Sequence, residues 1–172
     1  MKKYFLILVL FVSYSTLKAQ ETINWLSFEK AIQMNSKNPK YILIDVYTDW
    51  CGWCKKLDNT TYKNDSITKY INEHFYAVKL DGEGKEDITY NGQTFKYKEE
   101  GRSKYNEFAA MIMNGKLSYP TTIIMGKNEK VLDNIPGYLD EKNMEKILVF
   151  FAKEKYKTTT WADFTKSFKS NL

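Results

Sequence analysis

The chain has 172 residues, a length that suits a single domain. Apolar residues make up 43% of the chain and charged residues 27%, which is ordinary for a soluble globular protein. Without the first 19 residues, which hold Lys2, Lys3 and Lys18 and no acidic residue, the 26 basic residues fall to 23 against 21 acidic ones, and this balance gives no strong case for nucleic-acid binding.

Residues 1–19 have the three parts of a secretory signal peptide. A positive start, MKK, precedes a short apolar run at 4–14, and the segment ends on Ala19, after which we expect cleavage. The alternative is an uncleaved anchor, but a membrane-spanning helix needs about 20 apolar residues and this run is about half as long. The cleavage site also lacks the cysteine of a bacterial lipoprotein. We therefore expect a periplasmic or otherwise exported protein, cut to residues 20–172, without stable membrane insertion.

Apolar periodicity divides the rest of the chain into alternating strands and helices. Ser27 is typical of a helix N-cap, and Pro39 ends the helix that follows it. Residues 40–48, KYILIDVYT, are a largely apolar run that predicts a buried central strand. We expect strands at 22–25, 40–48, 76–80, 121–125 and 131–135, and helices at 27–38, 52–62, 66–75, 103–114, 140–155 and 160–168.

Residues 82–97 interrupt this alternation. Asn91 and Gly92 lie between alternating apolar residues in ITYNGQTF, which is the strongest short-range signal of a β-hairpin. The order of elements predicts an α/β fold with one central mixed sheet flanked by helices. It also predicts a hairpin insertion at about 82–97, before the third main helix, and a helical C-terminal extension at about 157–172.

Both cysteines of the chain lie in DWCGWCKK, directly after the predicted central strand. An exported protein lies where disulfides can form, yet a bridge between Cys51 and Cys54 would close so small a loop that it would add little stability. Cys51 lies at the start of the next helix, where backbone N–H groups and the helix dipole stabilise a thiolate. Cys54 lies one turn further in and should be more buried. This placement predicts that Cys51 attacks a substrate disulfide and that Cys54 resolves the mixed disulfide.

Three other interpretations of the cysteine pair compete with this one. A zinc site needs four ligands, but the chain has no third cysteine and a single histidine, His74. A static structural disulfide is disfavoured by the short loop, and two inert thiols are the least expected in an oxidising compartment. We therefore expect no metal and no organic cofactor, since the cysteine pair itself would carry the electrons.

The stretch YILIDVYTDWCGWCKKL resembles the active-site region of the thioredoxin superfamily. It is most similar to the reducing thioredoxin-like domain at the C-terminus of DsbD, a membrane thiol:disulfide interchange protein, and to related periplasmic domains. Shared features are Asp-x-Tyr-x-Asp-Trp-Cys and a Thr-Tyr/Phe element after the helix, here Thr61-Tyr62. The resemblance covers about residues 25–151, without the hairpin insertion or the tail after Tyr156. It implies a thioredoxin fold.

The resemblance also implies roles for charged residues. Cys51 resembles the nucleophile and Cys54 the resolving thiol, Asp45 resembles the buried carboxylate that assists proton transfer at the second cysteine, and Lys79 resembles the partner of that carboxylate. Burial within ILIDVY should itself raise the pKa of Asp45, which suits a general acid or base, unless the residue reaches water at the strand end. For Lys79 the alternative is a lysine that snorkels to solvent. Asp58 matches an acidic residue of the DsbD-like domain, or else lies on a solvated helix face.

Tyr119-Pro120-Thr121 resembles the cis-proline loop of the superfamily. That loop lies beside the cysteines, and its backbone can pair with an extended substrate segment. Trp50, Trp53 and Tyr119 would form an apolar rim around the first cysteine, unless they are ordinary surface or core aromatic residues. The five residues of this loop and rim are therefore the predicted substrate-binding set.

Trp53 departs from the best-known thioredoxin motif, which has proline before the second cysteine. Residues between the cysteines tune the reduction potential, which spans about −270 mV to about −120 mV across the superfamily. We predict a thiol:disulfide oxidoreductase that acts on protein thiols and disulfides, in the reducing direction, with a DsbD-like membrane protein as electron donor. The alternatives are a redox-inactive peptide-binding or protein-binding module and a disulfide oxidase or isomerase.

Overall fold

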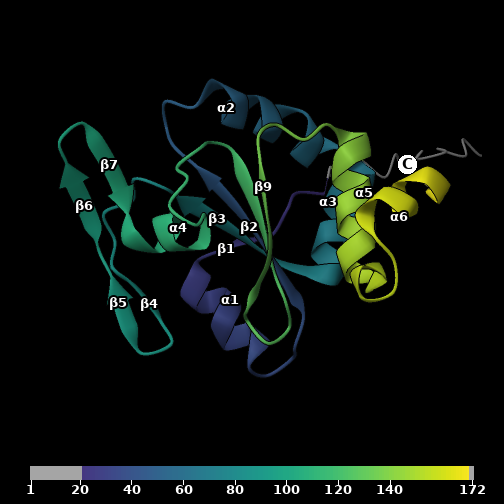
Figure 1. Ribbon diagram of the computed structural model, residues 1–172, viewed down its shortest axis with the longest axis horizontal. Coiled ribbons are helices and arrows are strands. Elements are labelled where there is room, and N and C mark those ends of the chain that lie inside the picture. The colour runs from purple at the N-terminus through teal and green to yellow at the C-terminus, as the bar shows by residue number, and fades with distance from the viewer. Residues whose placement is uncertain (1–20, 171–172) are drawn as a thin grey trace, which may run out of the picture.

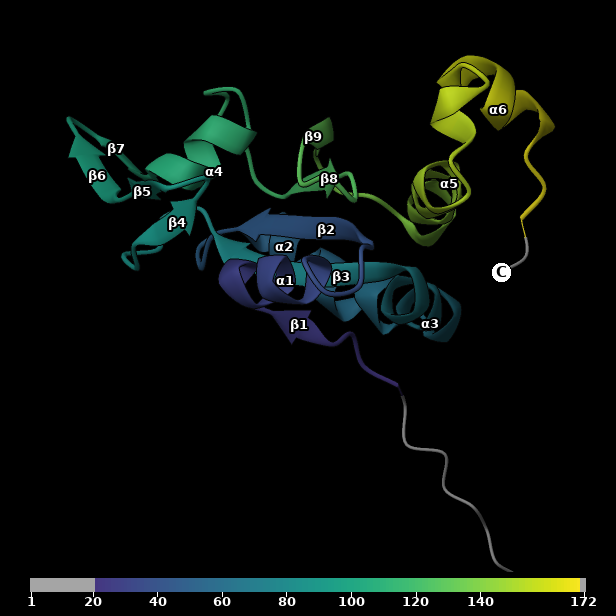
Figure 2. The same cartoon turned by 90° about the horizontal axis from the view of Figure 1, so that it is seen from below.

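The computed structural model describes residues 21–170, so the expected signal peptide lies outside the described residues. Its centre is a mixed five-stranded sheet in the order β1 (Trp25–Leu26), β3 (Phe75–Asp81), β2 (Tyr41–Tyr47), β8 (Thr121–Met125) and β9 (Val131–Pro136) (Figure 1). β1, β3 and β2 run parallel, whereas β8 and β9 are antiparallel to their neighbours. Figure 2 shows this strand order from β1 at one edge to β9 at the other. Within residues 21–170, no helix has the length and apolar character needed to span a bilayer.

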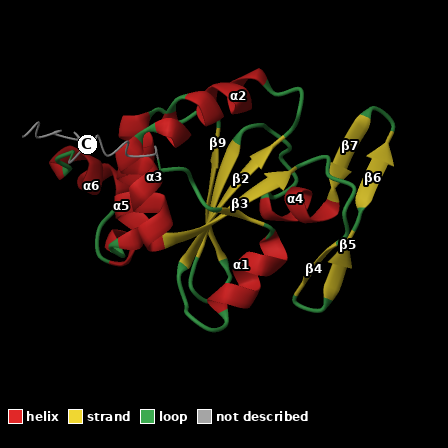
Figure 3. Ribbon diagram, turned by 180° about the vertical axis from the view of Figure 1, so that it is seen from behind, coloured by secondary structure: helices red, strands yellow, loops and turns green. Residues whose placement is uncertain are grey.

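Helices cover both faces of the sheet (Figure 3). α1 (Phe28–Asn35) and α4 (Glu107–Ile112) pack on one face. The helices of the other face are α2 (Gly52–Asn59), α3 (Asp65–His74), α5 (Glu141–Ala152) and α6 (Trp161–Ser167), with 3₁₀ turns at Thr61–Lys63 and Lys155–Lys157. The predicted α/β fold with a central mixed sheet is therefore confirmed.

β2 is buried on both faces, and its residues alternate between them. Leu43 belongs to the core beneath α2, α3 and α5, whereas Ile44 and Val46 belong to the core beneath α1 and α4. Asp45 therefore points to the same face as Leu43, toward the helix that carries the cysteines. This alternation explains why a nearly continuous apolar run contains one carboxylate on a defined side.

The hairpin predicted from Asn91-Gly92 is present. β4 (Ile88–Tyr90) and β5 (Gln93–Phe95) pair antiparallel, and both turn residues have positive φ, 51° and 77°, as a two-residue turn of type I′ requires. Ile88 and Phe95 lie opposite each other and are buried against the core beneath α1 and α4. The hairpin is therefore anchored to the domain by its apolar face.

A second hairpin follows, and it makes the predicted helix at 103–114 wrong in its first turn. β6 (Tyr97–Glu100) pairs with β7 (Ser103–Asn106) around Gly101, whose φ is 62°, so the helix begins only at Glu107. Asn106 caps α4 by accepting from the Phe108 amide, and its Nδ2 donates to two carbonyls of the loop before β4. The insertion therefore extends to residue 106, beyond the predicted end at about 97.

The first predicted strand, 22–25, is also misplaced, because only Trp25 and Leu26 pair with β3. The helix predicted at 52–62 is divided into α2 and the 3₁₀ turn Thr61–Lys63. The terminal helix expected at 160–168 is found as α6, whose N-cap is Thr160.

Candidate active site at the Cys51–Cys54 disulfide

The two cysteines form a disulfide at the start of α2. Cys51 is the N-cap of this helix, and its Sγ accepts a hydrogen bond from the Cys54 amide at 3.0 Å. The Cys51 amide is held by the carbonyl of Thr48 at 3.1 Å. Both cysteines are buried in the disulfide form, Cys54 slightly more than Cys51. A backbone N–H directed at a sulfur, together with the helix dipole, would stabilise a thiolate on Cys51 after reduction.

Asp45 lies on β2, in the strand that leads to the cysteines, and its side chain is 0% exposed. Its Oδ2 accepts a hydrogen bond from Lys79 Nζ at 2.5 Å, because Asp45 and Lys79 are directly paired across β2 and β3. Burial raises the pKa of Asp45 to about 6, although the Lys79 ammonium opposes the rise. The predicted burial of Asp45 and its pairing with Lys79 are confirmed. A carboxyl group with this pKa can accept or give a proton near neutrality.

Lys79 bridges two carboxylates. Besides Asp45 it donates to Asp58, which lies on α2 four residues after Cys54. Burial acts to lower the pKa of Lys79, but the two carboxylates outweigh it and the pKa is raised. Lys79 therefore stays charged while Asp45 titrates.

Three aromatic rings surround the Lys79 ammonium, a feature that the sequence analysis missed. Its Nζ lies 5.1, 5.0 and 5.4 Å from the ring centroids of Trp25, Tyr47 and Tyr62. These distances are within the range of cation–π attraction. One signal was available: Tyr47 lies two residues after Asp45 on the same strand, so both side chains point to one face.

Two tryptophans flank the disulfide and are exposed, as the predicted rim requires. Trp50 is 66% exposed, and its indole nitrogen donates to Glu83 at 3.1 Å. Its ring meets that of Tyr119 edge-on, with centroids 5.8 Å apart. Trp53 is 57% exposed, and its ring centroid lies 5.6 Å from that of Tyr138.

Lys56 lies over both rings of the second pair. Its Nζ is 4.8 Å from the centroid of Trp53 and 4.8 Å from that of Tyr138. One flank of the disulfide therefore has an aromatic pair with a cation, and the other has Trp50 held by a carboxylate. Glu83 and Tyr138, which complete the two flanks, were not predicted.

The Tyr119–Pro120 peptide bond is cis, as the resemblance implied. Tyr119 is half-buried, and the Pro120 carbonyl accepts from the Gly137 amide at 2.8 Å. Thr121 is 1% exposed, and its hydroxyl donates to the Ser118 carbonyl at 2.8 Å. Its side chain therefore braces the loop from inside, so the predicted contact of Thr121 with a substrate would be made by its backbone.

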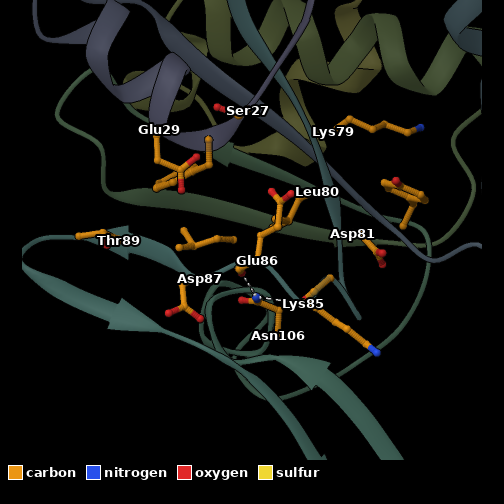
Figure 4. Close-up of a pocket in the computed structure, with 14 residues that line it drawn as sticks. Ser27, Glu29, Lys79, Leu80, Asp81, Lys85, Glu86, Asp87, Thr89 and Asn106 are labelled. Carbon is orange, nitrogen blue, oxygen red and sulfur yellow. Dashed lines mark hydrogen bonds between the residues drawn. The ribbon is translucent and has the colours of Figure 1, made fainter.

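A separate pocket of about 610 Å³ lies between the start of α1, the end of β3 and residues 84–89 (Figure 4). Lys79 lies at one end of it, with its ammonium directed away from the acidic side chains of Glu86 and Asp87. Among the described residues, no group of three or more histidines, cysteines, aspartates or glutamates is arranged to hold a metal ion.

Comparison with known families gives the context for this geometry. Residues 28–152 match the family model described as a thioredoxin-like domain. The chain belongs to the thioredoxin-like domain family. The match begins in α1 and ends with α5, so it includes the disulfide, Asp45, Lys79 and the cis-proline loop.

Solved structures share the fold at low sequence identity. A thioredoxin-fold protein from Helicobacter pylori aligns with a TM-score of 0.57 and 22% identity, over 75% of this chain and 80% of that one. The DsbH oxidoreductase aligns at 0.54 and 15%, over 77% and 85% of the two chains. A putative disulphide-isomerase from Bacteroides thetaiotaomicron aligns at 0.53 and 22%, over 76% and 94%. The more specific likeness to the C-terminal domain of DsbD stays a prediction.

Curated relatives match only a part of this thioredoxin-like domain. An uncharacterized protein of Caenorhabditis elegans is 30% identical over 71 residues, 41% of this chain. The spermatogenesis-associated protein 20 of Mus musculus is 27% identical over 78 residues, 45% of this chain. The matched region is 10% of each relative's own length.

Proposed function

We propose that this thioredoxin-like domain is an exported thiol:disulfide oxidoreductase that reduces disulfides in other proteins. The observation that carries the proposal is the disulfide at the N-terminus of α2, where Cys51 Sγ receives the Cys54 amide, with the buried Asp45 on the strand that leads to it. The helix start favours a thiolate at Cys51, and the carboxyl group supplies a proton acceptor with a pKa near neutrality.

The reaction consists of two exchanges. In the reduced protein the Cys51 thiolate attacks one sulfur of a substrate disulfide, and the other substrate sulfur leaves as a thiolate that takes up a proton. Cys54 then gives its proton to the Asp45 carboxylate, and the Cys54 sulfur attacks Cys51 Sγ. The Cys51–Cys54 disulfide forms, the second substrate sulfur leaves, and two electrons have passed to the substrate. A membrane donor of the DsbD kind would return the disulfide to the dithiol.

The surface around the disulfide supports a protein substrate. Trp50 and Trp53 expose large apolar surfaces on its two sides, and exposed aromatic residues are typical of protein interfaces. The backbone beside Pro120 can pair with an extended segment of the substrate. The contacts would then combine side-chain burial against the rim with main-chain hydrogen bonds.

An insulin-reduction assay tests the activity. We expect turnover by the wild type with a dithiol donor and its loss in Cys51→Ser, whereas Cys54→Ser should accumulate a mixed disulfide through Cys51. As a matched control, Ser36→Ala changes a hydroxyl at the C-cap of α1, away from the cysteines, and should leave turnover unchanged. A wild-type protein that is inactive after full reduction would contradict the proposal and would favour a binding module.

The direction of exchange needs its own measurement, because one similar structure bears the name of a putative disulphide-isomerase. Equilibrium with a glutathione redox buffer, read by thiol alkylation and mass, gives the potential of the cysteine pair. We expect a value nearer to thioredoxin, about −270 mV, than to DsbA, about −120 mV. A value near DsbA would overturn the reducing direction and leave the exchange activity intact.

A further inference from the structure

Several buried polar atoms near the active site have no hydrogen-bond partner among the described residues, and three of them lie around the Asp45 carboxyl group. They are Asp45 Oδ1, the Tyr62 hydroxyl and the Thr122 hydroxyl. Asp45 and Thr122 are 0% exposed and Tyr62 is 5% exposed. An isolated buried polar group is costly, so three such groups that pack on one face of the sheet point to a common role.

The strand register brings these side chains together. Asp45 on β2 is directly opposite Thr122 on β8, and in an antiparallel pair the two side chains point to the same face. Tyr62 packs on this face in the core beneath α2, with its ring 5.4 Å from Lys79 Nζ. Burial holds the pKa of Tyr62 well above its usual range, Asp45 raises it further, and the neighbouring Thr122 hydroxyl lowers it. The three polar groups are therefore close enough to influence one another.

The two oxygens of Asp45 have different surroundings. Oδ2 accepts from Lys79, so a proton taken up by the carboxylate belongs on Oδ1. Oδ1 must then accept a hydrogen bond when Asp45 is ionised and donate one when it is protonated. A hydroxyl group can do both, since it carries one donor and two acceptor sites. The raised pKa of Tyr62 keeps its proton in place as a donor.

We propose that small rotations of the Tyr62 and Thr122 side chains close hydrogen bonds from their hydroxyls to Asp45 Oδ1, which lacks a partner among the described residues, so that Tyr62 and Thr122 act as positioning residues in both protonation states of the carboxyl group during thiol–disulfide exchange. This positioning role rests on the proposed function as a thiol:disulfide oxidoreductase. The two hydroxyls orient the carboxyl group, and the hydrogen bonds that they donate stabilise its ionised form in an apolar site. They touch neither the substrate nor the reacting sulfurs.

The charged and titratable groups that face Asp45 come from each element packed against it. Lys79 reaches it from β3, Asp58 and Cys54 lie on α2, and Tyr62 lies on the 3₁₀ turn after α2. Lys79 stabilises the ionised form, whereas Asp58 opposes it. The hydroxyls add to the effect of Lys79, because a donated hydrogen bond favours the charged carboxylate.

The test is the titration of Asp45 by NMR in protein labelled at the aspartate carboxyl carbons. In the oxidised protein, Tyr62→Phe and Thr122→Val should each raise the pKa of Asp45 by about one unit, because each removes a hydrogen bond to a charged group. The mixed disulfide should then resolve about fivefold more slowly at pH 6, since fewer carboxylates are ionised, and at the wild-type rate at about pH 9. A purely structural defect would lower the rate at every pH.

Two variants serve as controls. Tyr70 on α3 also has a buried hydroxyl without a partner, but it faces the side of α5, so Tyr70→Phe should leave the titration of Asp45 unchanged. Thr122→Ser keeps the hydroxyl and should keep the wild-type pKa. If Asp45 titrates at one pH in wild type, Tyr62→Phe and Thr122→Val, with all three folded by circular dichroism, the proposal is overturned. The titration needs no turnover, so a failure of insulin reduction is a separate result.

Discussion

Asp45→Asn should raise the free energy of unfolding of the oxidised protein, and the size of this increase should depend on pH. Burial raises the pKa of Asp45 from its ordinary 3.8 to about 6. As the pH rises through this interval, the unfolded chain releases the proton first, so the folded state loses stability and stays less stable at higher pH. The difference of about two pKa units corresponds to about 3 kcal/mol. Asparagine does not ionise, and its amide oxygen can still accept from Lys79.

The free energy of unfolding from urea titrations of wild type and Asp45→Asn measures this effect. The difference in the free energy of unfolding between the variant and wild type should grow by about 3 kcal/mol from pH 4 to pH 8. The two proteins should show equal slopes of this free energy against urea concentration. Asp58→Asn is the matched control, because Asp58 bonds the same Lys79 but is 40% exposed, and it should change stability by less than about 1 kcal/mol. A stability difference between Asp45→Asn and wild type that is the same at pH 4 and pH 8 would show that burial does not raise the pKa of Asp45.

Three further predictions concern the surroundings of the disulfide. Gly82→Ala would place a Cβ 2.4 Å from the Tyr119 ring, so the ring must shift; we expect kcat/KM for insulin to fall severalfold while Tm changes by only a few degrees. Trp53→Ala removes an exposed ring that packs on Tyr138, so KM should rise, as measured by initial rates, while the free energy of unfolding changes by less than about 1 kcal/mol. Asn106→Ala removes the cap of α4 and two hydrogen bonds to the preceding loop, so urea titration should show a loss of about 2–4 kcal/mol; a change below about 0.5 kcal/mol would mean that this loop is held by other contacts.

Local patterns in the sequence predicted much of the chemistry. The Cys-Gly-Trp-Cys spacing places one sulfur at the first position of a helix, and a helix start has free N–H groups wherever it occurs. The apolar run around Asp45 predicted its burial, and Asn91-Gly92 predicted a hairpin, because both depend on neighbouring residues alone. The cis bond before Pro120 came from the family resemblance.

Tertiary structure decided which residues meet. That Lys79 and Thr122 lie on either side of Asp45 follows from the register of β3 and β8 against β2, and a shift of one residue would turn each side chain to the opposite face. The aromatic residues around Lys79 come from three separate segments, so no single stretch of sequence contains them. Packing of this kind also buried Thr121. Sequence determined where a thiolate and a carboxylate can form, and long-range packing determined the groups that tune them.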